Sequence, residues 1–184
     1  VLAILEGMRA SPSLASRPSP LHVPELQRDL RLADLLYLND YGARPQGQPR
    51  APRECTQFAF WGERSEGGGI IAGRNMDGEN DIRKVTVSHF LAHAVVQPDG
   101  ASFVHFMWPG FVAVASGVNQ RGLWVMMNDG SSPEHGPQAR RATPYGWTVR
   151  QMLARAETVN ATVGVVAAHA GETGGTCPMG CNLL

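Results

Sequence analysis

Short apolar segments separated by turn sequences fill the middle of the chain, and this alternation constrains the fold more than any other feature. The turns fall at the triple glycine 67–69, at 97–100 and at 118–121. Turn sequences at such close intervals are typical of consecutive antiparallel strands. The strands expected around them are 56–61, 70–74, 85–96, 102–108, 111–117 and 122–128.

Helical periodicity is present on both sides of this strand region. Apolar residues recur at helical spacing over 24–39, with Pro24 in the first turn. A second helix is expected over 144–157 and a third through 163–168, before a last strand at 181–184. A run of strands followed by helices predicts an α+β domain rather than a parallel doubly wound sheet. The apolar face of the second helix consists of Val149, Met152, Leu153 and Ala156.

The composition argues against two classes of partner. Sixteen basic residues balance sixteen acidic ones, so no overall charge attracts nucleic acid. The apolar stretches are far shorter than the roughly 20 residues that a membrane-spanning helix needs. We therefore expect neither a nucleic-acid partner nor a membrane span, whereas homo-oligomerisation and the cellular compartment stay open.

The first 54 residues differ in texture from the rest of the chain. Residues 9–24 are rich in serine and proline, and residues 42–53 are rich in proline, glycine and arginine. Both stretches should therefore be exposed connections. The second connection leads directly to Cys55. At the other end, the segment 182–184, Asn-Leu-Leu, is typical of the middle of a strand, so we expect a fragment of a longer protein.

Several short motifs in the strand region carry reactive side chains. If the turn at 67–69 folds the chain back, Arg74 comes to the strand beside Cys55, and Asp77 lies just past the strand end. The hairpin geometry thus fits a thiol with a guanidinium and a carboxylate nearby. The motifs are Cys55-Thr56-Gln57-Phe58, Gly73-Arg74-Asn75-Met76-Asp77, Gly117-Val118-Asn119-Gln120-Arg121-Gly122-Leu123 and Met127-Asn128-Asp129.

Taken together, these motifs resemble the N-terminal nucleophile hydrolases of the choloylglycine hydrolase and penicillin V acylase group. They are more similar still to the acyl-coenzyme A:6-aminopenicillanic acid acyltransferase family. In those families a Cys-Thr or Cys-Ser opens the mature enzyme, and an Arg-Asn-x-Asp motif returns beside it one hairpin later. The match covers residues 26–184. It implies an αββα four-layer sandwich, incomplete here, with 1–54 as a precursor segment and 55–184 as the front part of the catalytic domain.

The resemblance also implies a reaction. The bond between Glu54 and Cys55 would be cut, and Cys55 would become the nucleophile, with its new α-amine as the base. Arg74 would hold the thiolate by its fixed positive charge, and Asp77 would hydrogen-bond the amine and orient it. Asn128 would donate to the oxygen that becomes negative during attack.

The expected substrate is a small-molecule acyl amide or thioester, whose acyl group passes through an acyl-cysteine to water or to an amine. Bile-acid conjugates, penicillins, N-acyl amino acids, acyl-homoserine lactones and peptides all fit. Trp61, Trp108 and Trp124 are candidates for an apolar acyl-binding wall, although aromatic residues on strands are more often ordinary core. No cofactor is expected. A competing hypothesis, from another class, is an inactive fragment or binding module that keeps the fold without being processed.

Each of these residues also has a purely structural interpretation. A lone cysteine in an apolar segment is usually a small buried residue, and Arg74 with Asp77 has the spacing of a surface ion pair. Asn128 equally fits a turn. Asn119 competes with Asn128 for the oxyanion role, although its Val-Asn-x-x-Gly setting is more typical of a turn.

A zinc site can be written from two histidines and two cysteines. The pairs are His89 with His93 and Cys177 with Cys181. Residues i and i+4 of a strand lie about 13 Å apart, too far to hold one ion. We therefore expect no metal, and we assign no role to the histidines.

Overall fold

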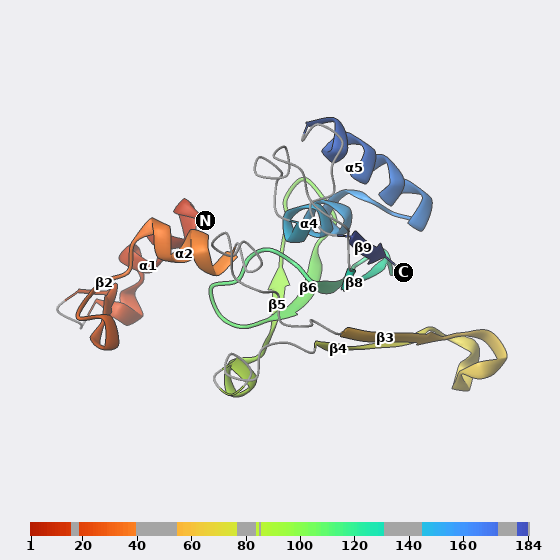
Figure 1. Cartoon of the computed structure of the whole chain (residues 1–184), viewed down its shortest axis with the longest axis horizontal. Coiled ribbons are helices and arrows are strands. Elements are labelled where there is room, and N and C mark those ends of the chain that lie inside the picture. Colours follow the sequence, from red (N-terminus) through yellow and green to blue (C-terminus); the bar gives the residue numbers. More distant parts are fainter. Residues whose placement is uncertain are drawn as a thin grey trace. The chain divides into compact units, whose positions relative to one another are not determined.

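The computed structural model describes residues 1–15, 19–39, 55–76, 84, 86–130, 145–172 and 180–183. Within these ranges the chain combines four α-helices with small antiparallel sheets, as the expected α+β class requires (Figure 1). The chain forms two compact units. One consists of 1–48 together with 109–112, and the other of 49–108 together with 113–184.

The first unit is a small layer of helices with a very short hairpin. Three leucines, Leu5, Leu21 and Leu35, form its buried cluster. Asn39, at the end of the second helix, donates from Nδ2 to Gly110 O at 2.9 Å and accepts from the Val112 amide at 2.7 Å. The elements in order are α1 (Leu2–Ala10), η1 (Pro12–Leu14), β1 (His22–Val23), η2 (Pro24–Leu26), β2 (Arg28–Asp29) and α2 (Leu32–Asn39).

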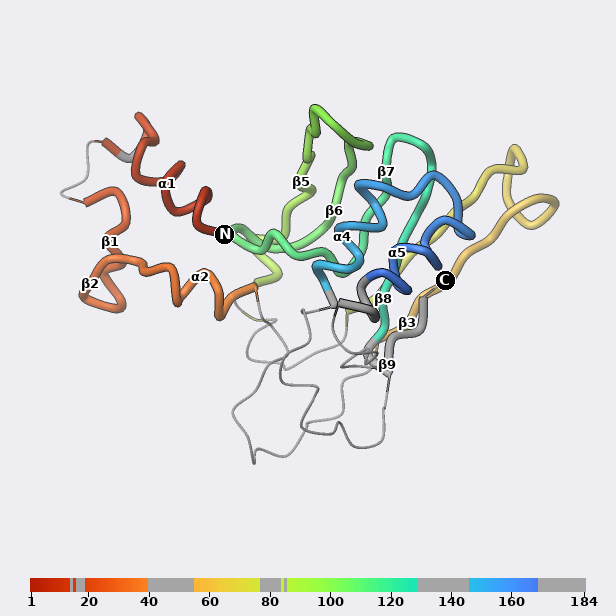
Figure 2. The backbone as a smooth tube through the Cα atoms, turned by 90° about the horizontal axis from the view of Figure 1, so that it is seen from above, coloured from red at the N-terminus to blue at the C-terminus, as the bar shows by residue number. Residues whose placement is uncertain are grey.

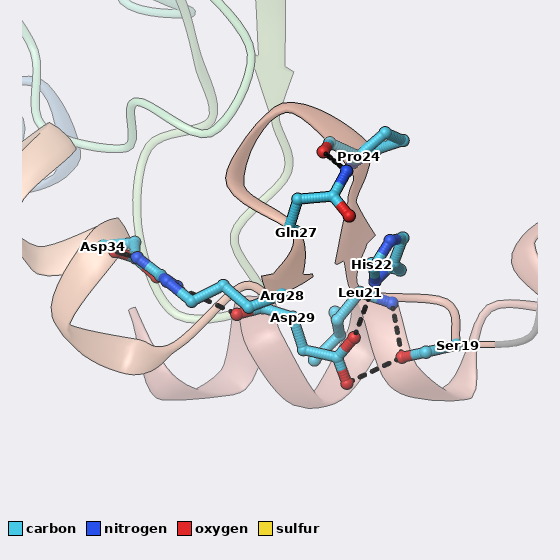
Figure 3. Close-up of polar contacts among 8 residues, drawn as sticks. All are labelled: Ser19, Leu21, His22, Pro24, Gln27, Arg28, Asp29 and Asp34. Atoms are coloured by element: carbon cyan, nitrogen blue, oxygen red, sulfur yellow. Dashed lines mark hydrogen bonds and ion pairs between the residues drawn. The ribbon is translucent and has the colours of Figure 1, made fainter.

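The helix predicted over 24–39 is wrong in its first half, because α2 begins only at Leu32. Gln27 has a left-handed φ of 51°, which ends η2 and turns the chain back into β2. The Asp34 carboxylate then accepts the Arg31 amide at 2.8 Å and two Arg28 nitrogens at 2.7 and 2.8 Å, which fixes the start of α2. Figure 3 shows this Arg28–Asp34 pair beside the hairpin.

The hydrogen bond from Arg28 is also the main reason why the pKa of Asp34 lies below its ordinary value. On the other side of the hairpin, Asp29 accepts from Ser19 Oγ at 2.8 Å (Figure 3). These polar contacts replace the helical turn that apolar spacing predicted.

The second unit contains a separate hairpin and a five-stranded antiparallel sheet. α4 packs against β7 and β8, and α5 packs against α4. Figure 2 shows both helices, in blue, beside the sheet strands. The hairpin strands are β3 (Cys55–Phe60) and β4 (Ile71–Met76), joined through η3 (Gly62–Arg64) and η4 (Glu66–Gly68). After η5 (Val87–His89), the sheet strands in spatial order are β5 (Leu91–Val95), β6 (Phe103–Met107), β7 (Ser116–Asn119), β8 (Trp124–Gly130) and β9 (Gly180–Leu183); the helices are α4 (Tyr145–Arg155) and α5 (Val159–Glu172).

The core of this unit lies between the sheet and α4. The apolar face predicted for the second helix is confirmed, since all four of its residues are buried. The hairpin, the strands at 102–108 and 122–128, and the helix at 144–157 are also confirmed, within a few residues at their ends. The buried cluster is Phe103, Val114, Leu123, Val125, Met127, Val149, Met152, Leu153 and Ala156.

Two predicted strands are shorter than expected. The strand at 85–96 is reduced to β5, because its partner β6 ends at Met107, which pairs with Leu91. The strand at 111–117 is reduced to its end, because β7 begins only at Ser116. The Val114 amide donates to Gly146 O of α4 at 2.9 Å, so the helix takes the backbone bond that a strand would have needed.

Candidate functional site

The register of the β3–β4 hairpin brings Cys55 and Arg74 together. Cys55 pairs with Met76, and Gln57 pairs with Arg74, so Arg74 is the diagonal neighbour of Cys55 on one face. A long side chain can reach a diagonal neighbour on an antiparallel pair. Arg74 Nη2 donates to Cys55 Sγ at 3.3 Å. This contact follows from period-two alternation on both strands and from the length of the connection between them.

The opposite face of the hairpin is apolar and exposed. The rings of Phe58 and Phe60 lie side by side in a tilted arrangement, with their centroids 5.4 Å apart. The Phe58 ring covers Gly73, where an added Cβ would lie 2.6 Å from a ring atom. Glycine beside Arg74 therefore lets an aromatic ring shield the strand on the face away from the thiol.

Asn128 reaches Cys55 from the five-stranded sheet. It lies on β8, and its Nδ2 donates to Cys55 O at 3.3 Å. The accepting atom is the main-chain oxygen of the cysteine, so the contact fixes the backbone that carries the thiol. An amide nitrogen has two hydrogens, and the second one can donate to another oxygen.

Asn119, the competitor for the oxyanion role, is a structural residue. Its Oδ1 accepts the amides of Arg121 and Leu123, both at 3.0 Å. Its Nδ2 donates to Leu153 O at 3.0 Å and Ala156 O at 2.9 Å, at the end of α4. The turn interpretation of Asn119 is confirmed: Oδ1 holds the turn, and Nδ2 holds the end of α4 on the sheet.

Three buried polar atoms in this region lack a hydrogen-bond partner within the described ranges: Gln57 Oε1, Arg74 Nε and Asn128 Oδ1. Buried polar atoms are paired in the great majority of cases, so such a group needs an explanation. The sequence pointed to Arg74 and Asn128 but not to Gln57. The alternation of β3 would have revealed it, because Cys55, Gln57 and Ala59 share the half-buried face.

Two of the predicted site residues, Glu54 and Asp77, lie outside the described residues. Their roles stay predictions. On the sheet, Asn128 pairs with Asn182 of β9, so a second asparagine is at the same level of the register. Sequence reasoning placed Asn182 in a strand and gave it no role.

The three tryptophans proposed for an acyl-binding wall occupy different places. Trp61 follows β3 and is 65% exposed, at the end of that strand opposite to Cys55. Trp124 opens β8, about 13 Å along the strand from Asn128. Trp108 follows β6 and is buried. The hairpin and β8 thus carry Trp61 and Trp124 away from the thiol along their strands.

The histidines form a separate feature. His89 lies in η5 and not on a strand, so the spacing argument used against zinc does not hold for it. His93 stacks on His105 with ring centroids 4.7 Å apart. Burial, helped by His93 and Arg150, lowers the pKa of His105 to about 4. Among the residues that the structure describes, no three His, Cys, Asp or Glu side chains lie close enough to hold a metal ion.

No protein-family model matches the chain, and no curated protein matches it. None of the helices in the described ranges is long and apolar enough to cross a membrane. The geometry around Cys55 is therefore the basis for a functional inference.

Proposed function

We propose that the chain is the front part of an N-terminal nucleophile amide hydrolase or acyltransferase with Cys55 as its nucleophile. The observation that carries the proposal is the 3.3 Å contact from Arg74 Nη2 to Cys55 Sγ. A guanidinium is a fixed positive charge with several N–H donors, and here one of them donates to the sulfur that would attack the substrate. The two antiparallel sheet pieces and the helices on one of them are compatible with part of an αββα sandwich.

Processing would come first. Cys55 Sγ bonds to the carbonyl carbon of Glu54, the C–N bond to Cys55 breaks, and that nitrogen takes the thiol proton. Water then adds to the thioester carbon and the C–S bond breaks. The products are a new carboxylate at Glu54 and a chain that starts at Cys55, with its thiol restored and a new α-amine.

Turnover would repeat this chemistry on a small-molecule acyl amide or thioester. Sγ adds to the acyl carbon while the α-amine of Cys55 takes the thiol proton and passes it to the leaving group. Water or an acceptor amine then displaces the sulfur, which regains a proton. Asn128 supports this step because its amide already lies at the Cys55 backbone, 3.3 Å from Cys55 O.

Intact mass and N-terminal sequencing of the protein, made from its complete coding sequence, test the proposal. We expect a chain that begins at Cys55 and an acyl adduct on it after incubation with a panel of amides. Cys55→Ala should abolish both while the protein folds, and Cys55→Ser should slow processing so that the uncut chain accumulates.

Cys177→Ala is the matched control and should be processed like the parent. An uncut parent protein that forms no adduct with any amide or thioester would overturn the proposal and favour a binding module. Processing and adduct formation that survive in Cys55→Ala would overturn the choice of nucleophile.

A further inference from the structure

Gln57 and Arg74 face each other in the β3–β4 hairpin, but their side chains are not hydrogen-bonded to each other. They pair directly in the β3–β4 register, one carrying an acceptor and the other a donor. Gln57 Oε1 and Arg74 Nε are both buried and have no hydrogen-bond partner in the part of the chain that the structure describes. A buried polar atom left in this state is unfavourable, because it has lost its hydrogen bonds to water and gained none within the protein.

The burial of these two atoms indicates what their partner is. A ligand entering from solvent cannot reach atoms that are closed to it, so the partner has to come from within the protein. Gln57 and Arg74 satisfy each other's need in one step, because a guanidinium Nε–H donates and a side-chain amide oxygen accepts. The two residues face each other in the register, which places both side chains on one face of the hairpin.

We propose that Gln57 is a positioning residue, whose Oε1 takes the Arg74 Nε–H and so holds the guanidinium plane with Nη2 directed at the Cys55 thiol. The proposal rests on the proposed function, since Arg74 is taken to serve that thiol. The guanidinium is planar, so fixing Nε also fixes where Nη2 lies. In this structure Nη2 contacts Sγ at 3.3 Å while Nε has no hydrogen-bond partner among the described residues, so the guanidinium plane can still turn about that contact, and a bond from Nε to Gln57 would fix it.

The test is the rate at which iodoacetamide alkylates Cys55 at one pH, read by peptide mass and normalised to Cys177 and Cys181 of the same molecule. Gln57→Leu removes the acceptor at similar size, and we expect alkylation of Cys55 to slow by about tenfold, the equivalent of one hydrogen bond. Arg74→Met should slow it at least as much.

The double variant distinguishes positioning from a general loss of structure. If Gln57 acts through Arg74, Gln57→Leu/Arg74→Met reacts no more slowly than Arg74→Met alone, whereas independent effects multiply. Gln97→Leu is the matched control, because Gln97 Nε2 is likewise buried and without a partner among the described residues, but lies on the turn after β5. It should react like the parent.

Multiplying effects, or a parental rate in Gln57→Leu, would overturn the inference. So would an equal loss in Gln97→Leu. Alkylation needs neither processing nor turnover, so a failure of the proposed function leaves this result readable, and the reverse is also true.

Discussion

The β3–β4 hairpin and the five-stranded sheet use their protected faces in opposite ways. The sheet covers its face with α4 and fills the space with apolar residues, such as Phe103, Val125 and Met127, each at most 3% exposed. The hairpin keeps Cys55 and Arg74 on its half-buried face and leaves aromatic rings exposed on the other. A two-stranded hairpin alone is at most marginally stable, so the hairpin depends on what covers it.

This difference indicates that the sheet provides most of the stability, whereas the inner face of the hairpin carries the reactive groups. Apolar burial is the main stabilising contribution in the sheet, and the buried polar side chain of Asn119 serves to hold α4 in place. The hairpin's inner face is instead arranged by a few hydrogen bonds, such as that of Arg74 to Cys55 and that of Asn128 to Cys55 O. Substitutions should therefore act on reactivity in the hairpin and on stability in the sheet.

Of the substitutions that test this contrast, Asp77→Asn should have the largest effect, on the rate of acyl-enzyme formation. The proposed role of Asp77 is to orient the Cys55 amine, and asparagine keeps the shape while removing the charge. We expect acyl-enzyme formation to fall by about 10² to 10⁴, the usual contribution of a positioned proton-transfer group, with an unchanged unfolding transition. Equal acylation rates for Asp77→Asn and the control Asp99→Asn, in the turn after β5, would reduce the motif to an ordinary ion pair.

Asn128→Ala should have the next largest effect. It removes the amide at Cys55 and should lower acyl-enzyme formation by about 10² to 10³, as for other oxyanion donors. The midpoint of urea unfolding should change little, because the side chain makes a single long contact. Asn160→Ala on the exposed start of α5 is the control. An acylation rate in Asn128→Ala equal to that of the parent would show that Asn128, and with it β8, takes no part in the reaction.

Asn119→Ala should show the reverse pattern. It removes two hydrogen bonds within the β7–β8 turn and two from this turn to the end of α4, and we expect a loss of about 3 kcal/mol in unfolding free energy. Acylation by the molecules that stay folded should be near parental. Urea unfolding together with acylation per folded molecule checks both parts, and a stable but inactive variant would contradict them.

The smallest effect concerns the His93–His105 pair in the sheet. Because the pKa of His105 is lowered to about 4, the unfolded chain binds a proton at its ordinary pKa of 6.5 before the folded one does. Stability should be level above pH 6.5 and should fall between pH 6.5 and 4, by at most about 1.4 kcal/mol per pH unit. Urea unfolding at pH 7, 6 and 5 measures the slope, which should be shallower in His105→Gln. An unchanged slope in His105→Gln would show that other groups cause the pH dependence of stability.

The sequence predicted those parts of the fold that local patterns determine. The turn at 67–69 and the alternation after Cys55 were enough to place Arg74 beside it, and helical spacing was enough for α4. The start of α2 was missed because Arg28 and Asp34 form it through side chains that apolar spacing does not register. The early end of β5 and the late start of β7 depend on partners far along the chain. Alternation is enough to place Gln57 on the Cys55 face, but its pairing with Arg74 is known only from the register.

The ring of Phe58 over Gly73 gives the hairpin a spectroscopic signature. Protons held above the face of an aromatic ring resonate upfield, so the two Gly73 α-protons should be displaced from the values of an open glycine. A one-residue slip of register would move Gly73 away from the ring and restore ordinary shifts. A single ¹³C-labelled glycine at 73 would therefore report, in cut and uncut protein alike, whether the strand that carries Arg74 keeps its alignment with Cys55.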